Sequence, residues 1–255
     1  MAGLSADPGT SAASDASDLA KKLANPIAAL ISVPFQSNFD FGGGPSDDGF
    51  RYTLNVQPVI PFSLSDEWNL ISRTIVPFIH QDDMIGTGTQ SGLSDTVQSA
   101  FFSPKDPTAG GWIWGAGPVF LLPTATDERL GAEKFGLGPT AVALRQTGGW
   151  TYGGLVNHIE SVAGDGGRED VSATFLQPFI TYITPKQTTF VLNMESTFDW
   201  KNSQWTIPVN AMVAQLVKVG KVPVQFQVGG RVYAEGPTGA PEWGLRFAVT
   251  LLFPK

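Results

Sequence analysis

Few residues of this chain are of the types that carry out nucleophilic or acid–base chemistry. It has two histidines, His80 and His158, and no cysteine, which excludes disulfides, thiol chemistry and cysteine-ligated metals. His80 is followed by Asp82, and His158 by Glu160. Because a catalytic triad is recognised by its geometry, such spacing is no catalytic motif. We therefore expect no enzyme activity.

Three acidic pairs, Asp47–Asp48, Asp82–Asp83 and Glu169–Asp170, have the oxygen ligands that a hard divalent cation prefers. Carboxylates of solvated loops are the commoner explanation of such pairs. The glycine runs 42–44 and 164–167 lack the strand-then-helix context of a phosphate-binding loop. The sequence therefore predicts no cofactor.

Amide and charged side chains instead recur at every second position of extended segments. In 31–41, Gln36, Asn38 and Asp40 alternate with apolar residues. Side chains two residues apart share one face of a strand, so each such segment has one polar and one apolar face. We predict that the polar faces line the interior of a barrel and form the path of a solute. The set is Gln36, Asn38, Asp40, Arg51, Asn55, Gln57, Arg73, Asn193, Glu195, Asp199, Gln225, Gln227, Arg231 and Arg246.

A hairpin closed around 42–49 would place polar residues opposite one another. Its register pairs Phe41 with Phe50 and Asp40 with Arg51, and continues to Asn38 with Thr53 and Gln36 with Asn55. The register predicts a cross-strand ion pair between Asp40 and Arg51. Such polar groups either fill the interior or form a constriction that binds solute.

Twelve segments can hold these residues as strands. The alternation is clear in five of them and mixed in several others, and most have the roughly 9 to 11 residues that cross a bilayer at a tilt. The clear segments are 31–41, 51–64, 190–200, 222–234 and 243–253, and the others are 68–80, 93–103, 111–124, 135–146, 149–162, 171–184 and 204–217.

The connections alternate between long polar loops and tight turns, as in outer-membrane barrels. Ser103–Gly110 is longer than the other turns, and Lys201–Ser203 is shorter than the other loops. All seven tryptophans lie at segment ends, which predicts two aromatic girdles at the membrane interfaces.

Composition agrees with this pattern. Charged residues make up 15% of the chain, against roughly 25% in soluble proteins. Mean hydropathy is +0.02, and there is no run of the roughly 18 to 20 apolar residues needed for a helical span. The net charge of -7 argues against a nucleic-acid partner, which needs a positive surface. The predicted fold is an all-β, transmembrane, antiparallel up-and-down barrel.

The first 26 residues differ from the rest. Residues 1–17 are rich in Ala, Ser, Asp and Gly and read as a tail, and Ser17 then precedes a short helix stopped by Asn25–Pro26. No basic segment followed by an apolar one marks a secretory signal at 1–20, so we expect a mature form. We predict that 1–26 form a tail and helix able to plug the periplasmic end, and that 27–255 form the barrel.

Several strings resemble a bacterial family over most of 19–255. They are Ile31–Gly42, Asn55–Pro61, Asp95–Pro104, Trp114–Thr124 and Trp243–Pro254. The family comprises outer-membrane transporters of the phenol-degradation meta-pathway type. The resemblance implies an outer-membrane location and uptake of small, including aromatic, compounds, and it carries no catalytic signature.

Three interpretations remain open. The first is a passive channel or transporter for small, hydrophobic or aromatic solutes, in contact with outer-membrane lipids and lipopolysaccharide. The second is a closed structural or adhesive barrel without transport. The third is a soluble β-sandwich or soluble barrel, in which the apolar faces would converge on a compact core.

Overall fold

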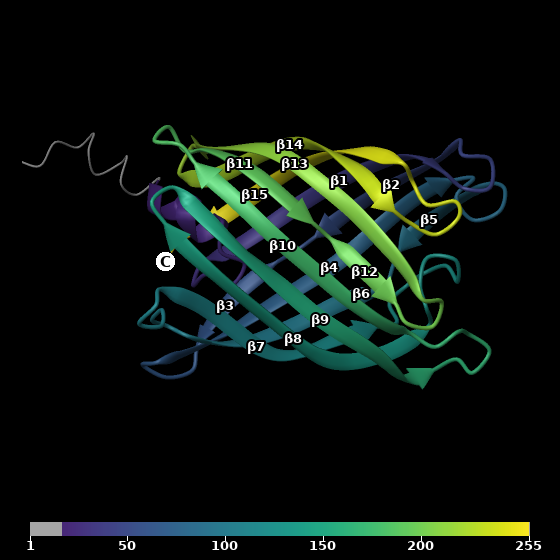
Figure 1. Ribbon diagram of the computed structural model, residues 1–255, viewed down its shortest axis with the longest axis horizontal. Coiled ribbons are helices and arrows are strands. Elements are labelled where there is room, and N and C mark those ends of the chain that lie inside the picture. The colour runs from purple at the N-terminus through teal and green to yellow at the C-terminus, as the bar shows by residue number, and fades with distance from the viewer. Residues whose placement is uncertain (1–16, 255) are drawn as a thin grey trace, which may run out of the picture.

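The computed structural model describes residues 17–254, which form a closed barrel of tilted antiparallel strands (Figure 1). One sheet closes on itself because β9 pairs with β10. Three pairs of strands, β2 with β3, β5 with β6 and β11 with β12, are successive parts of one crossing, so the barrel has twelve positions. The strands are β1 (Ile31–Gly43), β2 (Gly49–Val56), β3 (Val59–Ser63), β4 (Trp68–Asp82), β5 (Thr89–Leu93), β6 (Thr96–Pro104), β7 (Trp112–Leu122), β8 (Lys134–Thr147), β9 (Trp150–Gly164), β10 (Ser172–Ile183), β11 (Thr188–Met194), β12 (Ser196–Asp199), β13 (Gln204–Val219), β14 (Val222–Glu235) and β15 (Trp243–Phe253).

The three interruptions have local causes. Pro58 separates β2 from β3 and has no N–H to donate to the ladder. Glu195, between β11 and β12, lies opposite Pro208, whose carbonyl accepts its N–H. Between β5 and β6, the β4 pairings Phe78 with Leu93 and Ile75 with Val97 leave two residues of β4 facing three, which is a bulge.

All twelve predicted strand segments are confirmed, with ends shifted by a few residues. The largest shift concerns the loop predicted over Asp82–Gly92, which is confined to residues 83–88 because β4 and β5 extend to either side of it. The predicted register of the first hairpin is also confirmed, from Phe41 opposite Phe50 to Gln36 opposite Asn55.

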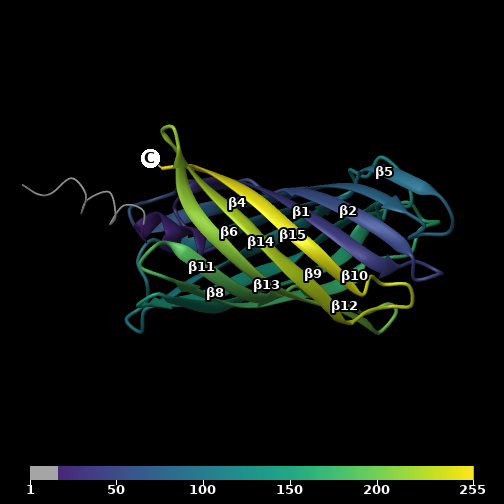
Figure 2. The same ribbon diagram turned by 90° about the horizontal axis from the view of Figure 1, so that it is seen from above.

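The two ends of the barrel differ, as Figures 1 and 2 show. We call one the loop end, formed by residues 44–48, 83–88, 123–133, 165–171, 200–203 and 236–242. The other is the turn end, formed by residues 64–67, 105–111, 148–149, 184–187 and 220–221. In outer-membrane barrels the short turns face the periplasm.

The outer surface is apolar where lipid would touch it. On β15, Leu245 and Phe247 are exposed while Arg246 between them is only 2% exposed. Trp68 and Trp114 meet edge to face at the turn end, and Phe41 stacks on Trp243 at the loop end, which confirms the two predicted girdles. A soluble sandwich would bury these residues, so the chain is built as a transmembrane barrel of the outer-membrane type.

No helix within residues 17–254 is long and apolar enough to span a membrane.

The expectation of a polar interior is confirmed for only part of the wall. Between β4 and β10 the inward side chains form an apolar cluster, which is Ile71, Phe101, Val142, Leu144 and Leu155 with Ile113, Phe175 and Phe179 packed against it. We call these residues the apolar wall. The strands that carry it are apolar on both faces, which is why their alternation is mixed in the sequence.

Residues 17–23 are helical, which confirms the predicted helix within the described residues; the predicted tail falls largely on residues 1–16, outside them. Ala20 of the helix packs against Ile183, Leu216 and Leu252, which face inward at the turn end. The chain then enters the barrel, where Ile27 joins the apolar wall. The side chain of Gln146 donates to the carbonyl of Lys21 at 2.8 Å and ties the helix to β8.

Candidate functional site

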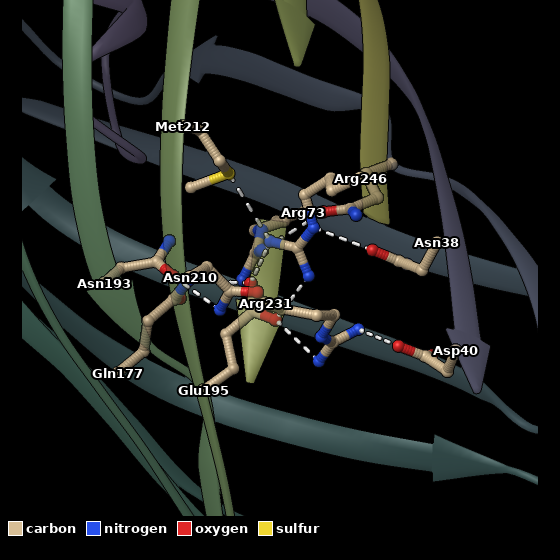
Figure 3. A network of polar contacts seen from close by, with 11 residues as sticks. Asn38, Asp40, Arg73, Gln177, Asn193, Glu195, Asn210, Met212, Arg231 and Arg246 are labelled. Carbon is tan, nitrogen blue, oxygen red and sulfur yellow. Dashed lines mark hydrogen bonds and ion pairs between the residues drawn. The ribbon is translucent and has the colours of Figure 1, made fainter. Parts of the chain in front are cut away.

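Glu195 is the centre of a polar network inside the barrel (Figure 3). It follows β11 at the interruption opposite Pro208 and faces inward. Arg246 of β15 donates to both of its carboxylate oxygens, from Nη1 at 2.9 Å and from Nη2 at 2.7 Å. This two-point geometry is the strongest arrangement available to a guanidinium and a carboxylate. Arg246 is held in place by Asn38 of β1, which accepts from its Nε at 2.7 Å.

A second ion pair lies beside the first. Arg231 of β14 is 3.5 Å from Asp40 of β1 and 3.8 Å from Glu195. Gly244 lies on β15, the strand between β14 and β1. It is opposite Arg231 of β14 on one side and Asp40 of β1 on the other. A Cβ at Gly244 would collide with Asp40 Oδ1, so the glycine provides the space in which Asp40 and Arg231 meet.

The predicted ion pair between Asp40 and Arg51 is not formed, although the two residues lie opposite each other. Arg51 instead donates from Nε to Gln81 at 2.8 Å, and Gln81 donates to Gln90 at 2.9 Å. Asp40 turns the other way, because Gly244 leaves Arg231 within its reach. The prediction was wrong because closure of the barrel places β15 beside β1 and β14 beside β15. Arg231 of β14 thereby comes within reach of Asp40, and the sequence of the first hairpin does not show this.

Carboxamides extend the network toward the turn end. Asn210 of β13 donates to Asn193 of β11 at 2.8 Å, and Gln177 of β10 donates to Glu195 at 3.4 Å. On the opposite side of the barrel, Arg73 of β4 donates to Gln57 at 3.3 Å. The network thus crosses the interior from β1 and β15 to β10, and Figure 3 shows Arg73 beside it.

A cavity of about 240 Å³ lies between this network and the N-terminal helix. Its lining joins polar strand residues to apolar residues of the helix and of β10. Six of the predicted site residues line it, namely Gln36, Gln57, Arg73, Asn193, Gln225 and Gln227.

The other eight predicted residues divide into four groups. Asn38, Asp40, Glu195, Arg231 and Arg246 meet in the network. Arg51 binds Gln81. Asn55 lies on β2, opposite Gln36. Asp199 is not part of the network: it accepts from the N–H of Lys201 at 2.8 Å and shapes the turn at the loop end.

Sequence reasoning missed two kinds of interior residue. Asn210 and Gln177 belong to strands whose faces are mixed, so the alternation did not single them out. The apolar wall was missed because an apolar residue in a barrel strand is expected to face lipid. The sequence signal for such inward apolar residues is a strand with apolar residues on both faces, and β8 to β10 have this pattern.

Both histidines make contacts that the sequence spacing did not reveal. His80 Nδ1 lies 2.6 Å from Ser91 Oγ across the β4–β5 ladder, and Nε2 is 3.5 Å from Asp82. His158 repeats this arrangement on the outer surface with Thr174 at 2.9 Å and Glu160 at 3.6 Å. Because Thr174 also accepts from Trp200 of the girdle at 2.9 Å, we assign the repeated arrangement to the polar edge of the girdle.

Two acidic residues of the loop end, Asp170 and Asp83, accept hydrogen bonds from other groups of the protein. Lys134 donates to Asp170 at 2.9 Å, and this bond holds the pKa of Asp170 below its usual value. Asp83 accepts from the N–H of Gly88 at 2.6 Å. No group of three or more side chains suited to a metal ion occurs within residues 17–254.

Comparisons of the whole chain with known proteins concern its fold. No family model and no curated protein matches the sequence. Among solved structures, the chain is similar to an outer-membrane channel from Pseudomonas putida F1, with a TM-score of 0.65 and 16% identity over 88% of this chain and 94% of that one. It is also similar to the beta domain of the Bordetella autotransporter BrkA, with a TM-score of 0.48 and 11% identity over 88% of this chain and 99% of that one.

The fold and interior therefore define a class: a twelve-position outer-membrane β-barrel with a charged network across its lumen. The likeness to the Pseudomonas putida channel shows that the two proteins share a fold. At this level of identity it says nothing about which solute this chain would transport.

Proposed function

We propose that the chain is a passive channel for small solutes across the outer membrane. The observation that carries the proposal is the charge and polarity of the interior. Arg231 and Arg246 meet Asp40 and Glu195 there, and amide side chains line the cavity beside them. A barrel that served only as a scaffold would gain more from a packed apolar interior, because replacing buried ion pairs by apolar residues is often stabilising.

The charge of the mid-barrel side chains supports a preference for anions. The network carries two guanidiniums, Arg231 and Arg246, against two carboxylates, Asp40 and Glu195, and Arg73 beside it adds a third guanidinium. A narrow path lined by an excess of one charge raises the local concentration of the opposite charge. This part of the lumen carries a net positive charge, although the whole chain carries a net charge of -7.

The apolar wall supports solutes with an apolar part. Its core residues, such as Ile71, Phe101 and Leu144, are fully buried, but Phe179 lines the cavity together with Arg73 and Gln36. A molecule with one polar and one apolar side would contact both kinds of residue there. Hydrophobic or aromatic compounds, as the sequence resemblance implies, have such a side. Outer-membrane lipids and lipopolysaccharide are the proposed partners of the outer surface.

The N-terminal helix is proposed as a plug at the periplasmic side. Its packing on Ile183, Leu216 and Leu252 puts it across part of the turn end. Solute would leave past it, either through the space beside the helix or after the helix undocks.

Reconstitution into planar bilayers tests the proposal. We expect discrete single-channel steps in KCl, and a reversal potential in a salt gradient that indicates anion preference. The folded state is checked in parallel by a heat-dependent shift in gel mobility. A correctly folded barrel that is electrically silent, both as the full chain and without residues 1–25, would favour the closed scaffold.

A further inference from the structure

The cavity between the network and the helix differs from the rest of the lumen in its charge. Two cationic residues line it, Arg73 from β4 and Lys22 from the helix, and no carboxylate is among its described lining residues. Glu195 lies beyond Gln177, and its charge is already matched by Arg246 and Arg231. An anion in the cavity would therefore meet positive charge on two sides.

Arg73 has hydrogen-bonding capacity to spare. A guanidinium carries five N–H donors. Within the described residues Arg73 uses one of its terminal nitrogens for Gln57, at 3.3 Å, and it forms no ion pair within 4 Å. By contrast Arg246 is bound to both oxygens of Glu195. Arg73 thus keeps terminal N–H donors for a two-point contact with a carboxylate, and it is the arginine that lines the cavity.

The other side of the cavity is apolar. Phe179 and Val191 contribute from the barrel, and Leu23, Ala28 and Leu30 from the helix and the segment after it. At about 240 Å³ the cavity is slightly smaller than the roughly 300 Å³ at which small-molecule pockets usually begin. It suits a compact molecule with one apolar body and one anionic group.

We propose that this cavity binds a small organic monocarboxylate, with the carboxylate held by Arg73 and the apolar body packed between Phe179 and the N-terminal helix. Gln36, Gln225 and Gln227 add amide donors around the same space. The proposal deepens the proposed function, because the bound anion would be a solute of the channel. The site is distinct from the network, whose guanidiniums are already paired.

Equilibrium binding to the full chain in detergent tests the site with benzoate and its neutral isostere benzamide as probes. We expect benzoate to bind about tenfold more tightly or better, because a charge-assisted contact exceeds a neutral one by at least that factor. Arg73→Gln removes this preference and leaves benzamide binding unchanged. Phe179→Ala weakens both probes alike, because it removes apolar contact.

Arg51→Gln is the matched control, since Arg51 is an interior arginine bound to Gln81 and away from the cavity. It should keep the preference for benzoate. Equal binding of the two probes, a preference that survives Arg73→Gln, or competition by inorganic phosphate as strong as that by benzoate would overturn the proposal. Channel steps in KCl without a benzoate preference would reject the site alone, and Arg73-dependent binding to a silent barrel would reject the channel alone.

Discussion

Glu195 is the residue on which the interior charges converge. Removing its charge leaves Arg246, which is 2% exposed, and Arg231 without their shared partner. In Glu195→Gln we expect a stronger anion preference in reversal-potential measurements, because the lumen gains one net positive charge. We also expect a loss of up to about 3 kcal/mol in the free energy of unfolding, since a buried charge loses its counterion.

Glu160→Gln serves as the control for that variant. Glu160 is an exposed carboxylate on the outer surface of β9, so its loss should change neither quantity appreciably. An unchanged reversal potential in Glu195→Gln would contradict the assignment of Glu195 to the conducting path.

At the scale of elements, the N-terminal helix is held by apolar contact, and that contact can be removed without shortening the chain. Ala20→Asp places a carboxylate against Ile183, Leu216 and Leu252, where burial of a charge is strongly unfavourable. We expect a higher single-channel conductance in this variant, approaching that of a chain lacking residues 1–25. The rise follows from undocking of the helix from the turn end.

Lys21→Asp introduces the same side chain at the neighbouring exposed position and should leave the conductance near that of the unmodified chain. If Ala20→Asp and the deletion both conduct like the full chain, the helix is no plug.

Elements also show how far the sequence predicts this fold. Segments such as 31–41 and 243–253 have one apolar and one polar face, because one side lies on the outer surface and the other faces the interior network. The ends of their strands were predicted nearly correctly. The partner of Asp40 was not predictable, since it depends on barrel closure and on the space at Gly244. The cavity was not predictable either, because it joins residues of the helix to strands far along the chain.

At the scale of the whole molecule, neighbouring residues of one strand face different solvents. Val228 of β14 is 51% exposed on the outer surface, and Gln227 beside it lines the cavity. Val228→Arg should lower the free energy of unfolding by about 2–4 kcal/mol in bilayers, the cost of arginine in mid-membrane. Gln227→Arg, with the same new side chain in the lumen, should cost much less. Urea titration in vesicles measures both, and equal costs would mean that the outer surface does not face lipid.

The apolar wall also has a consequence for the chain before it enters the membrane. Strands β8 to β10 have apolar side chains on both faces, whereas β1 and β15 have one apolar and one polar face. In aqueous surroundings, the middle of the chain therefore has the stronger tendency to associate with other copies, because neither face of its strands is soluble. Periplasmic chaperones would therefore bind chiefly to this part of the chain. A bilayer covers only the outward apolar side chains, and the inward ones stay uncovered until the barrel closes.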